Sequence, residues 1–340
     1  MLLLRDDVIR EAMAGQPVID GLEVMLGRPV EGALELPPRM TIEDARNGSF
    51  LRLMPCIAYD TGYAGFKAMN YHPEHGVRYM IALIARADGE LVALLDADWI
   101  TAFRTAATVA IAVRHLAPQR VETMTMIGSG TQARALLEAV AAVLTPGQVL
   151  VYSPTAENRD RFAADIREQF ALPSEAVSDA AGAINASEVV LSAFRAGAEP
   201  VIHADAVRDG ALVCGISSVR PEHREVDVSV WETSRVFVDD LAHVRQSGDG
   251  RAATELGFTA DGNVRELWEL LRDPTLGRRS RDERVLFKSV GTAEQDIALA
   301  ALVVDRAREL GVGEQLDEFP SRRPIQSRRA SASDAPPSTR

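Results

Sequence analysis

Apolar and polar residues follow one another along this chain in blocks that predict strands and helices in a set order. The apolar run over 121–127 leads into the turn sequence Gly128-Ser129-Gly130. A helical pattern starts at Thr131, and a second apolar run over 148–152 ends at Ser153. This succession predicts a strand, a glycine turn, a helix and a second strand.

The turn has the composition of a dinucleotide-binding turn. Gly128 permits a tight turn, Gly130 lets backbone amides approach a pyrophosphate, and the small Ala133 lets helix and strand pack closely. The helix N-terminus would point its free N–H groups and positive dipole at the phosphates. A turn without a ligand is the alternative. We predict cofactor contacts at Gly128, Ser129, Gly130, Thr131, Gln132 and Ala133.

The end of the second strand bears on the choice of cofactor. An acidic residue about 20 residues beyond the turn would bind the ribose 2′-hydroxyl of NAD, but Ser153 stands at the strand end. Ser153, Thr155 and Arg159 suit a 2′-phosphate better than a free hydroxyl, although Pro154 removes one backbone donor. We therefore predict NADP, with NAD as the alternative.

The rest of the pattern predicts an α/β protein of two parts. Apolar runs over 79–85 and 91–95 flank Asp88-Gly89, which is a strong hairpin signal. Residues 30–100 are expected to be mostly β, whereas 121–240 alternate between strand and helix. Further elements are expected as strands over 186–192, 210–216 and 236–239 and as helices over 106–116 and 292–310, the last ended by Gly311.

Composition adds the setting. A chain of 340 residues with 46% hydrophobic and 25% charged residues is typical of a globular protein of two domains. A net charge of −12 argues against nucleic acid or an anionic membrane as a partner. Two distant cysteines without metal-like spacing indicate a cytoplasmic protein, and the tail over 321–340 is expected to be disordered. The apolar N-terminus is too short for a signal peptide.

Four basic residues stand beside apolar segments or at expected strand ends. A guanidinium or ammonium group in such surroundings is costly unless it is paired. A buried ion pair with Asp96 or Asp98 is one explanation. The other is a pocket for a carboxylate, which the arginine fork binds in bidentate fashion. The four candidates are Arg39, Arg52, Lys67 and Arg104.

Histidine and acidic residues offer less. His72 and His75 flank Pro73 with no third ligand in the pattern, so we expect a polar turn and no metal. Asp227 follows an expected strand of the α/β part. It is either a helix cap or a ligand-facing acid, and the local pattern leaves both open.

Several motifs together resemble the ornithine cyclodeaminase/μ-crystallin family over residues 1–315. They are Leu53-Met54-Pro55, Gly65-Phe66-Lys67, the segment 100–107 with Arg104-Thr105, the glycine turn, and the segment 286–291. The resemblance implies an α/β fold with a Rossmann dinucleotide-binding domain over 118–291. It also implies a discontinuous mixed α+β catalytic and dimerisation domain over 1–117 and 292–320, and a homodimer.

The resemblance also implies roles for individual residues. Arg39, Lys67 and Arg104 would hold the substrate carboxylate, and Lys67 and Asp227 would be catalytic, with Asp227 as the acid/base. Further cofactor contacts are implied at Arg104, Thr105, Ser192 and Ala193, although Phe194 replaces a small hydroxyl residue of the family.

Arg52 departs from the pattern of the ornithine cyclodeaminases, which look to have an acidic residue at this position, just before the Leu-Met-Pro stretch. An arginine would repel a substrate ammonium group and could accept a second carboxylate. The sequence thus predicts an NAD(P)H-dependent reductase of α-imino acids or ketimines, in reverse an amino-acid dehydrogenase, with an acidic side chain on the substrate as one option. The alternatives are an ornithine cyclodeaminase-type ammonia lyase and a non-catalytic NADPH-binding protein.

Overall fold

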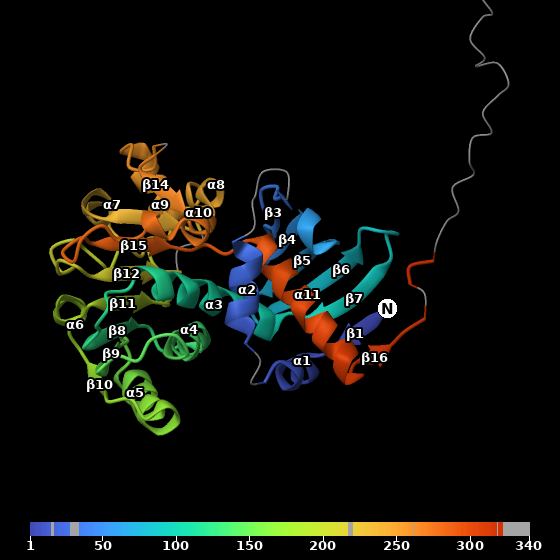
Figure 1. Cartoon of the computed structure of the whole chain (residues 1–340), viewed down its shortest axis with the longest axis horizontal. Coiled ribbons are helices and arrows are strands. Elements are labelled where there is room, and N and C mark those ends of the chain that lie inside the picture. The colour runs from blue at the N-terminus through green and yellow to red at the C-terminus, as the bar shows by residue number, and fades with distance from the viewer. Residues whose placement is uncertain (15–16, 28–33, 217–219, 261, 318, 322–340) are drawn as a thin grey trace, which may run out of the picture.

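Two eight-stranded sheets, joined through a long helix, form the molecule (Figure 1). The computed structural model describes residues 1–14, 17–27, 34–216, 220–260, 262–317 and 319–321. The expected disordered tail lies outside these residues, apart from Ser321. No helix in the described ranges is long and apolar enough to cross a membrane.

The first sheet has the strand order β16-β1-β7-β6-β5-β4-β2, with β3 also paired to β4. Its strands are β1 (Leu2–Leu4), β2 (Leu34–Glu35), β3 (Met40–Asp44), β4 (Ser49–Ala58), β5 (Tyr63–His72), β6 (Gly76–Ala85), β7 (Leu91–Asp96) and β16 (Glu314–Gln315). The predicted hairpin is confirmed, because β6 and β7 pair antiparallel around Gly89, whose φ is +76°.

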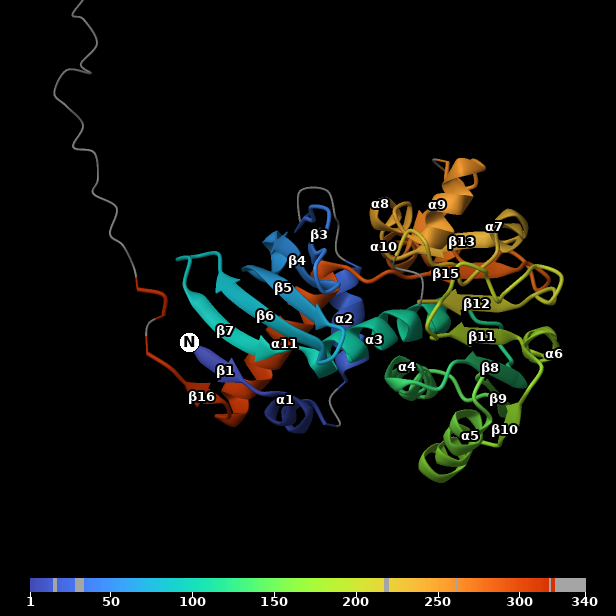
Figure 2. The same ribbon diagram turned by 180° about the vertical axis from the view of Figure 1, so that it is seen from behind.

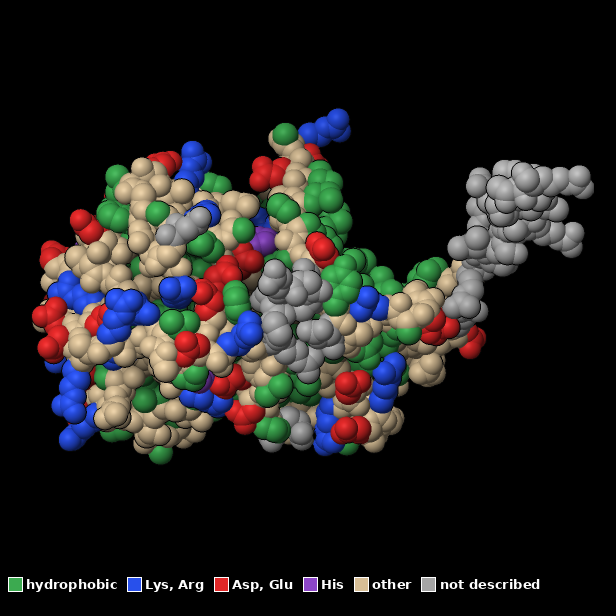
Figure 3. Space-filling view, turned by 45° about the horizontal axis from the view of Figure 1, so that its top comes forward, with side chains coloured by type: hydrophobic (Ala, Val, Ile, Leu, Met, Phe, Trp, Pro, Cys, Tyr) green, Lys and Arg blue, Asp and Glu red, His purple; other side chains and the backbone are tan. Residues whose placement is uncertain are grey.

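One face of the first sheet packs on α11 (Ala293–Leu310), which contacts β4, β5 and β6. Gly65 allows this approach, since a Cβ there would lie 2.7 Å from Ile297 Cδ1. The opposite face carries exposed apolar side chains at alternate positions of β3, β4 and β6: Met40, Ile42, Leu51, Ile57 and Met80. In the space-filling view, hydrophobic side chains gather along the projection formed by β3 and β4 (Figure 3).

The second sheet is parallel throughout, with the order β10-β9-β8-β11-β12-β15-β13-β14. The order reverses between β8 and β11, so the carboxyl ends of these two strands border the crevice where open α/β sheets bind ligands. The strands are β8 (Thr123–Ile127), β9 (Gln148–Tyr152), β10 (Ser174–Val177), β11 (Val189–Ser192), β12 (Leu212–Gly215), β13 (Arg235–Val238), β14 (Val264–Glu266) and β15 (Val285–Lys288).

The helix α3 (Asp98–Leu116) connects the two sheets (Figure 2). Ile100 belongs to the core under the first sheet, while the apolar residues from Ala106 to Leu116 belong to the core of the second. The other helices are α1 (Asp6–Met13), α2 (Val18–Leu26), α4 (Thr131–Ala141), α5 (Ala156–Phe170), α6 (Ala180–Ala186), α7 (Val228–Thr233), α8 (Leu241–Val244), α9 (Gly248–Glu255) and α10 (Leu267–Arg272).

The predicted elements of the α/β part are confirmed with small shifts at their ends. The predicted helix over 106–116 is α3, but α3 begins eight residues earlier, at Asp98, because 98–105 continue the helix towards the first sheet. The predicted C-terminal helix is α11, ended as expected by Gly311 at φ 66°. We retain the division into 1–117 with 292–320 and 118–291 as a proposal; the strands of each sheet fall on its own side of it.

Candidate functional site

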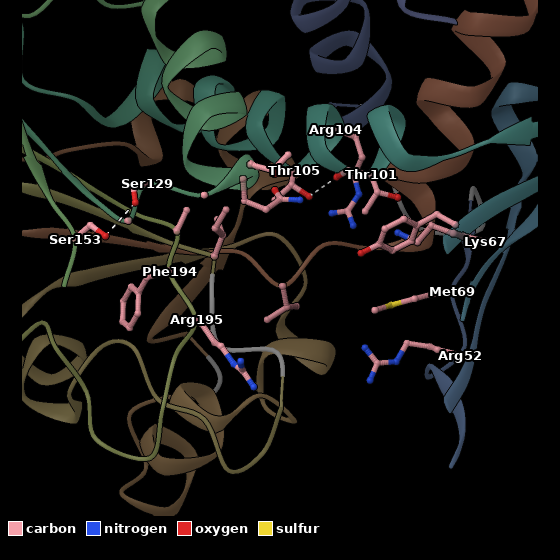
Figure 4. Close-up of a pocket in the computed structure, with 18 of the residues that line it drawn as sticks. Arg52, Lys67, Met69, Thr101, Arg104, Thr105, Ser129, Ser153, Phe194 and Arg195 are labelled. Carbon is pink, nitrogen blue, oxygen red and sulfur yellow. Dashed lines mark hydrogen bonds between the residues drawn. The ribbon is translucent and has the colours of Figure 1, made fainter. Parts of the chain in front are cut away.

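A cleft of about 870 Å³ lies between the two sheets, which is in the range of small-molecule sites. Side chains from β4 and β5 reach into it from the first sheet, those of α3 form its roof, and those after β8, β9 and β11 form the opposite wall (Figure 4). Predicted site residues that line the cleft are Arg39, Arg52, Lys67, Arg104, Thr105, Gly128, Ser129, Gly130, Thr131, Gln132, Ser153 and Ala193.

Strand alternation explains how distant residues meet on the first sheet. Arg52 pairs with Met69, and Met54 pairs with Lys67, so the four side chains point to the same face. Tyr79 pairs with Met69 on the next strand and joins them. One face of β4, β5 and β6 therefore forms the floor of the cleft.

A buried carboxylate holds two of the cationic side chains. Asp296 is 0% exposed and receives Lys67 Nζ at 2.7 and 2.9 Å and Arg104 Nε at 2.8 Å. Arg104 Nη1 also donates to Gln295 Oε1 at 3.1 Å. Burial lowers the pKa of Lys67 to about 7, against the opposing attraction of Asp296.

Arg39 is held by main-chain carbonyls. Its Nη2 donates to Val290 O at 2.7 Å and to Gly291 O at 2.5 Å. Asp239 fixes this turn by accepting from the backbone N–H of Val290 and Gly291, at 3.1 and 2.7 Å. Gly291 has φ +72°, and a Cβ there would overlap the Arg104 guanidinium. The turn after β15 therefore positions both arginines.

The cleft has an excess of positive charge. Its described lining contains five cationic side chains and no carboxylate, because Asp296 lies behind Lys67 and Arg104. Arg39 Nε is buried without a hydrogen-bond partner among the described residues. Burial, with repulsion from Arg104 and Arg52, lowers the pKa of Arg39 to about 10. The arrangement favours an anionic ligand, since a buried unsatisfied donor is costly.

The glycine turn fits a dinucleotide. Gly128 has φ +118°, and a Cβ there would collide with the carbonyl of Ala193. Gly130 has open space where a Cβ would stand, and it caps α4 without any side-chain hydrogen bond to the first N–H groups. Among the described residues no side chain caps the first N–H groups of α4, and such a helix N-terminus can receive a phosphate.

The end of β9 lies on the same wall. Ser153 accepts a hydrogen bond from Ser129 Oγ at 3.0 Å, and Arg159 donates to the carbonyl of Ser153 at 3.1 Å. Thr155 is the exposed N-cap of α5. Asn158 and Pro154 line the cleft, whereas Thr155 and Arg159 do not. Arg159 therefore stabilises the end of β9 without lining the cleft.

Three other predicted residues lie outside the cleft lining. Ala133 is buried in α4, and Ser192 is buried at the end of β11, next to Ala193. Asp227 caps α7, with Oδ1 accepting from Ser229 N at 3.0 Å, and it is not among the residues that line the cleft. These Ser229 hydrogen bonds lower the pKa of Asp227 despite the opposing effect of burial. The structure does not bring this carboxylate to the cleft, so it gives no support to an acid/base role.

The structure also brings in residues that the sequence analysis missed. Asp296 is the main one, and it replaces Asp96 and Asp98 as the partner expected for Arg104. Its signal was a carboxylate among the apolar positions of a predicted helix, between Ala293 and Ala300. Other lining residues missed are Met54, Met69, Tyr79, Thr101, Arg195 and Ile216.

The turn between β5 and β6 gathers His72, Glu74 and His75, whose ligand atoms lie within 4.8 Å of one another. His72 Nδ1 already accepts the backbone N–H of Glu74 at 3.2 Å. None of the three lines the cleft, and we assign them no part in its chemistry.

Comparison with known proteins identifies the family of this chain. The family model for the ornithine cyclodeaminase/mu-crystallin family matches residues 1–311. The chain belongs to this family. A Delta(1)-pyrroline-2-carboxylate reductase from Bacillus cereus is 30% identical over 290 residues, which are 83% of this chain and 89% of that protein.

Two solved relatives have the same fold. The Thermococcus litoralis Delta(1)-pyrroline-2-carboxylate reductase, in complex with NADH and L-proline, superposes with a TM-score of 0.86 and 29% identity, covering 93% of this chain and 100% of that chain. An archaeal alanine dehydrogenase dimer with bound NAD superposes with a TM-score of 0.86 and 26% identity, covering 94% and 99%. Both relatives therefore bind a nicotinamide dinucleotide in the complexes solved.

Two substitutions test the placement of the carboxylates. Asp227→Asn is expected to leave turnover within about threefold, because asparagine caps helices as well as aspartate. If Asp227 were the general acid, the same substitution would lower turnover by about 10²-fold or more.

Asp296→Asn is expected to lower turnover by at least about 10²-fold and the free energy of unfolding by about 3–5 kcal/mol, because two buried cations lose their partner. Steady-state kinetics and urea unfolding measure both, and the reverse ranking would restore Asp227 to the site.

Proposed function

We propose that this chain is an NAD(P)H-dependent reductase of α-imino acids or ketimines and, in reverse, an amino-acid dehydrogenase. The observation that carries the proposal is the juxtaposition, in one cleft, of a buried cationic cluster and a glycine turn open to phosphates. The names and bound molecules of the solved relatives, which act on small imino or amino acids with NADH or NAD, support it.

The two walls have separate roles. On one wall, Gly128, Ser129, Gly130 and Thr131 would hold the dinucleotide, whose reduced nicotinamide supplies a hydride when bound. On the other wall, Arg39, Lys67 and Arg104 would hold the α-carboxylate of the substrate. Charge-assisted hydrogen bonds from fixed donors orient the α-carbon toward the nicotinamide side and require no reorganisation during reaction.

Reduction of the C=N bond adds hydride to the α-carbon and a proton to the nitrogen. Lys67 is the titratable group best placed to hold that proton. Its ammonium lies in the cleft at 2% exposure, is oriented by Asp296, and has a pKa of about 7. A group with such a pKa can give up a proton at neutral pH.

Arg52 weighs against the cyclodeaminase alternative. Its guanidinium stands on the floor beside Met69 and points into the cleft (Figure 4). A substrate with a second ammonium group would meet a like charge there, which costs binding energy in a partly desolvated site.

We further propose a cytoplasmic homodimer. The first sheet has an exposed apolar face that includes Leu51 and Met80, and exposed apolar patches commonly form the interface between two copies of a chain. The archaeal relative was solved as a dimer. Cys56 and Cys214 are free and buried, and burial raises the pKa of both thiols.

A direct assay tests the proposed function. The purified chain is mixed with NADH or NADPH and with one imine substrate at a time. The substrates are Delta(1)-pyrroline-2-carboxylate and the imines that pyruvate or oxaloacetate forms with ammonium or methylamine. We expect cofactor oxidation that follows imine concentration. No oxidation across the panel would contradict the proposal; ammonia released from ornithine without net cofactor change would indicate a lyase, and tight NADPH binding alone a binding protein.

The pH dependence tests Lys67. A proton donor must be protonated, so kcat/KM for imine reduction is expected to fall as pH rises through about 7, and amino-acid oxidation to rise in the same window. Lys67→Arg keeps the charge but does not titrate in this range, so its profile should lose that limb. An unchanged limb in Lys67→Arg would assign the proton to another group.

The strand end after β9 tests the cofactor preference. Ser153→Asp places a carboxylate where it can bind a ribose 2′-hydroxyl and repel a 2′-phosphate. We expect the ratio of kcat/KM for NADPH over NADH to fall by about tenfold or more. Ser153→Ala, which adds no charge, is the matched control and should change the ratio little. Equal effects of the two substitutions would rule out this position as the determinant.

A further inference from the structure

The floor of the cleft carries its cations at two levels. Lys67, with Arg39 and Arg104, forms the inner level around Asp296. Arg52 forms an outer level on the neighbouring strand, where it stands opposite Met69 while Met54 stands opposite Lys67. Arg52 and Lys67 are therefore diagonal neighbours on one face, and the Cα atoms of such neighbours are about 7–8 Å apart in an antiparallel ladder.

Arg52 forms no salt bridge in the part of the chain that the structure describes, and Glu43 is the carboxylate whose charge acts on it. Arg52 Nε donates to Thr41 Oγ1 at 3.0 Å, and its guanidinium stacks 5.3 Å from the Phe50 ring centroid. Both contacts fix its direction, and neither neutralises its charge. The guanidinium fork is thus oriented and open toward the cleft (Figure 4).

A second arginine faces the same aromatic ring from the other part of the molecule. Arg220, in the segment after β12, lies 5.9 Å from the Phe50 ring centroid, and its salt bridge to Glu222 is long, at 3.8 Å. Burial and repulsion from Arg220 lower the pKa of Arg52. An anion beside Arg52 would relieve the repulsion between the two guanidiniums.

The dinucleotide does not account for Arg52. The glycine turn and Ser153 lie on the wall opposite Arg52, and Arg195 comes from the segment after β11 on that side (Figure 4). Between the two cationic levels, the floor presents the thioether side chains of Met54 and Met69. Two apolar side chains thus flank the space between the outer and the inner level.

We infer that the substrate is a dicarboxylic α-imino acid with four or five carbons, whose second carboxylate binds Arg52 with support from Arg220. The α-carboxylate occupies the inner level, the side-chain carbons lie over Met54 and Met69, and the distal carboxylate meets the Arg52 fork. This inference rests on the proposed reductase function and names its substrate class. The reaction is unchanged: hydride reaches the α-carbon, the proton reaches the imine nitrogen, and the reduced nicotinamide is oxidised.

The test compares substrates that differ by one carboxylate. Initial rates of NADH or NADPH oxidation are measured for the full chain with oxaloacetate or 2-oxoglutarate plus ammonium, and with pyruvate plus ammonium. We expect kcat/KM to favour the dicarboxylic acids by about tenfold or more. Arg52→Gln should lower their kcat/KM by about 10- to 100-fold, mainly through KM, and that of pyruvate by less than about threefold. Arg220→Gln should have a smaller effect of the same selectivity.

Arg46→Gln, on the exposed β3–β4 turn outside the cleft, is the matched control and should change neither substrate. Arg52→Lys keeps the charge but loses the fork, so it should retain part of the preference. Equal rates with pyruvate and oxaloacetate, or equal losses for both in Arg52→Gln, would overturn the dicarboxylate inference while leaving the reductase intact. Absence of imine reduction with every substrate would remove the proposed function itself.

Discussion

The site depends on one buried carboxylate that pairs with two cationic side chains, so that a net positive charge remains in the cleft. Asp296 is fully buried and binds both Lys67 and Arg104, yet Arg39 and Arg52 add further cations to the same cleft. Removing charges from water is expensive, and an ion pair offsets that cost only when its geometry and hydrogen bonds are good. The remaining positive charge is offset when an anionic ligand enters.

This constraint ties distant segments together. Asp296 lies on α11, Lys67 on β5 and Arg104 on α3, so the ion pairs join the C-terminal helix to the sheet and to the connecting helix. The turn after β15 adds a second link, because Asp239 orders the backbone that receives Arg39. The glycine turn faces this assembly from the other sheet. Carboxylate and cofactor sites are thus built by different elements and share one cleft.

Much of the fold followed from the sequence, because local signals determine it. The glycine turn, the Asp88-Gly89 hairpin and the Thr292 and Gly311 ends of α11 are short-range patterns with a mechanical reason. The cationic residues were also predictable, since a basic side chain in an apolar segment needs a partner. The partner itself was not, because Asp296 is 192 residues from Arg104 along the chain. Asp227 shows the opposite limit: its local pattern fitted a cap and an active-site acid equally well, and tertiary structure places it at the cap.

The proposed function requires the inner cations to bind the substrate carboxylate. A crystal structure of the protein with oxidised cofactor and an amino-acid product, L-aspartate first, tests it most directly. We expect carboxylate oxygens within hydrogen-bonding distance of Arg39 Nε, which lacks a partner among the described residues, and of Lys67 and Arg104, with the α-carbon facing the nicotinamide. An amino acid bound with its α-carboxylate elsewhere, and these cations still turned only to Asp296 and the backbone, would contradict it.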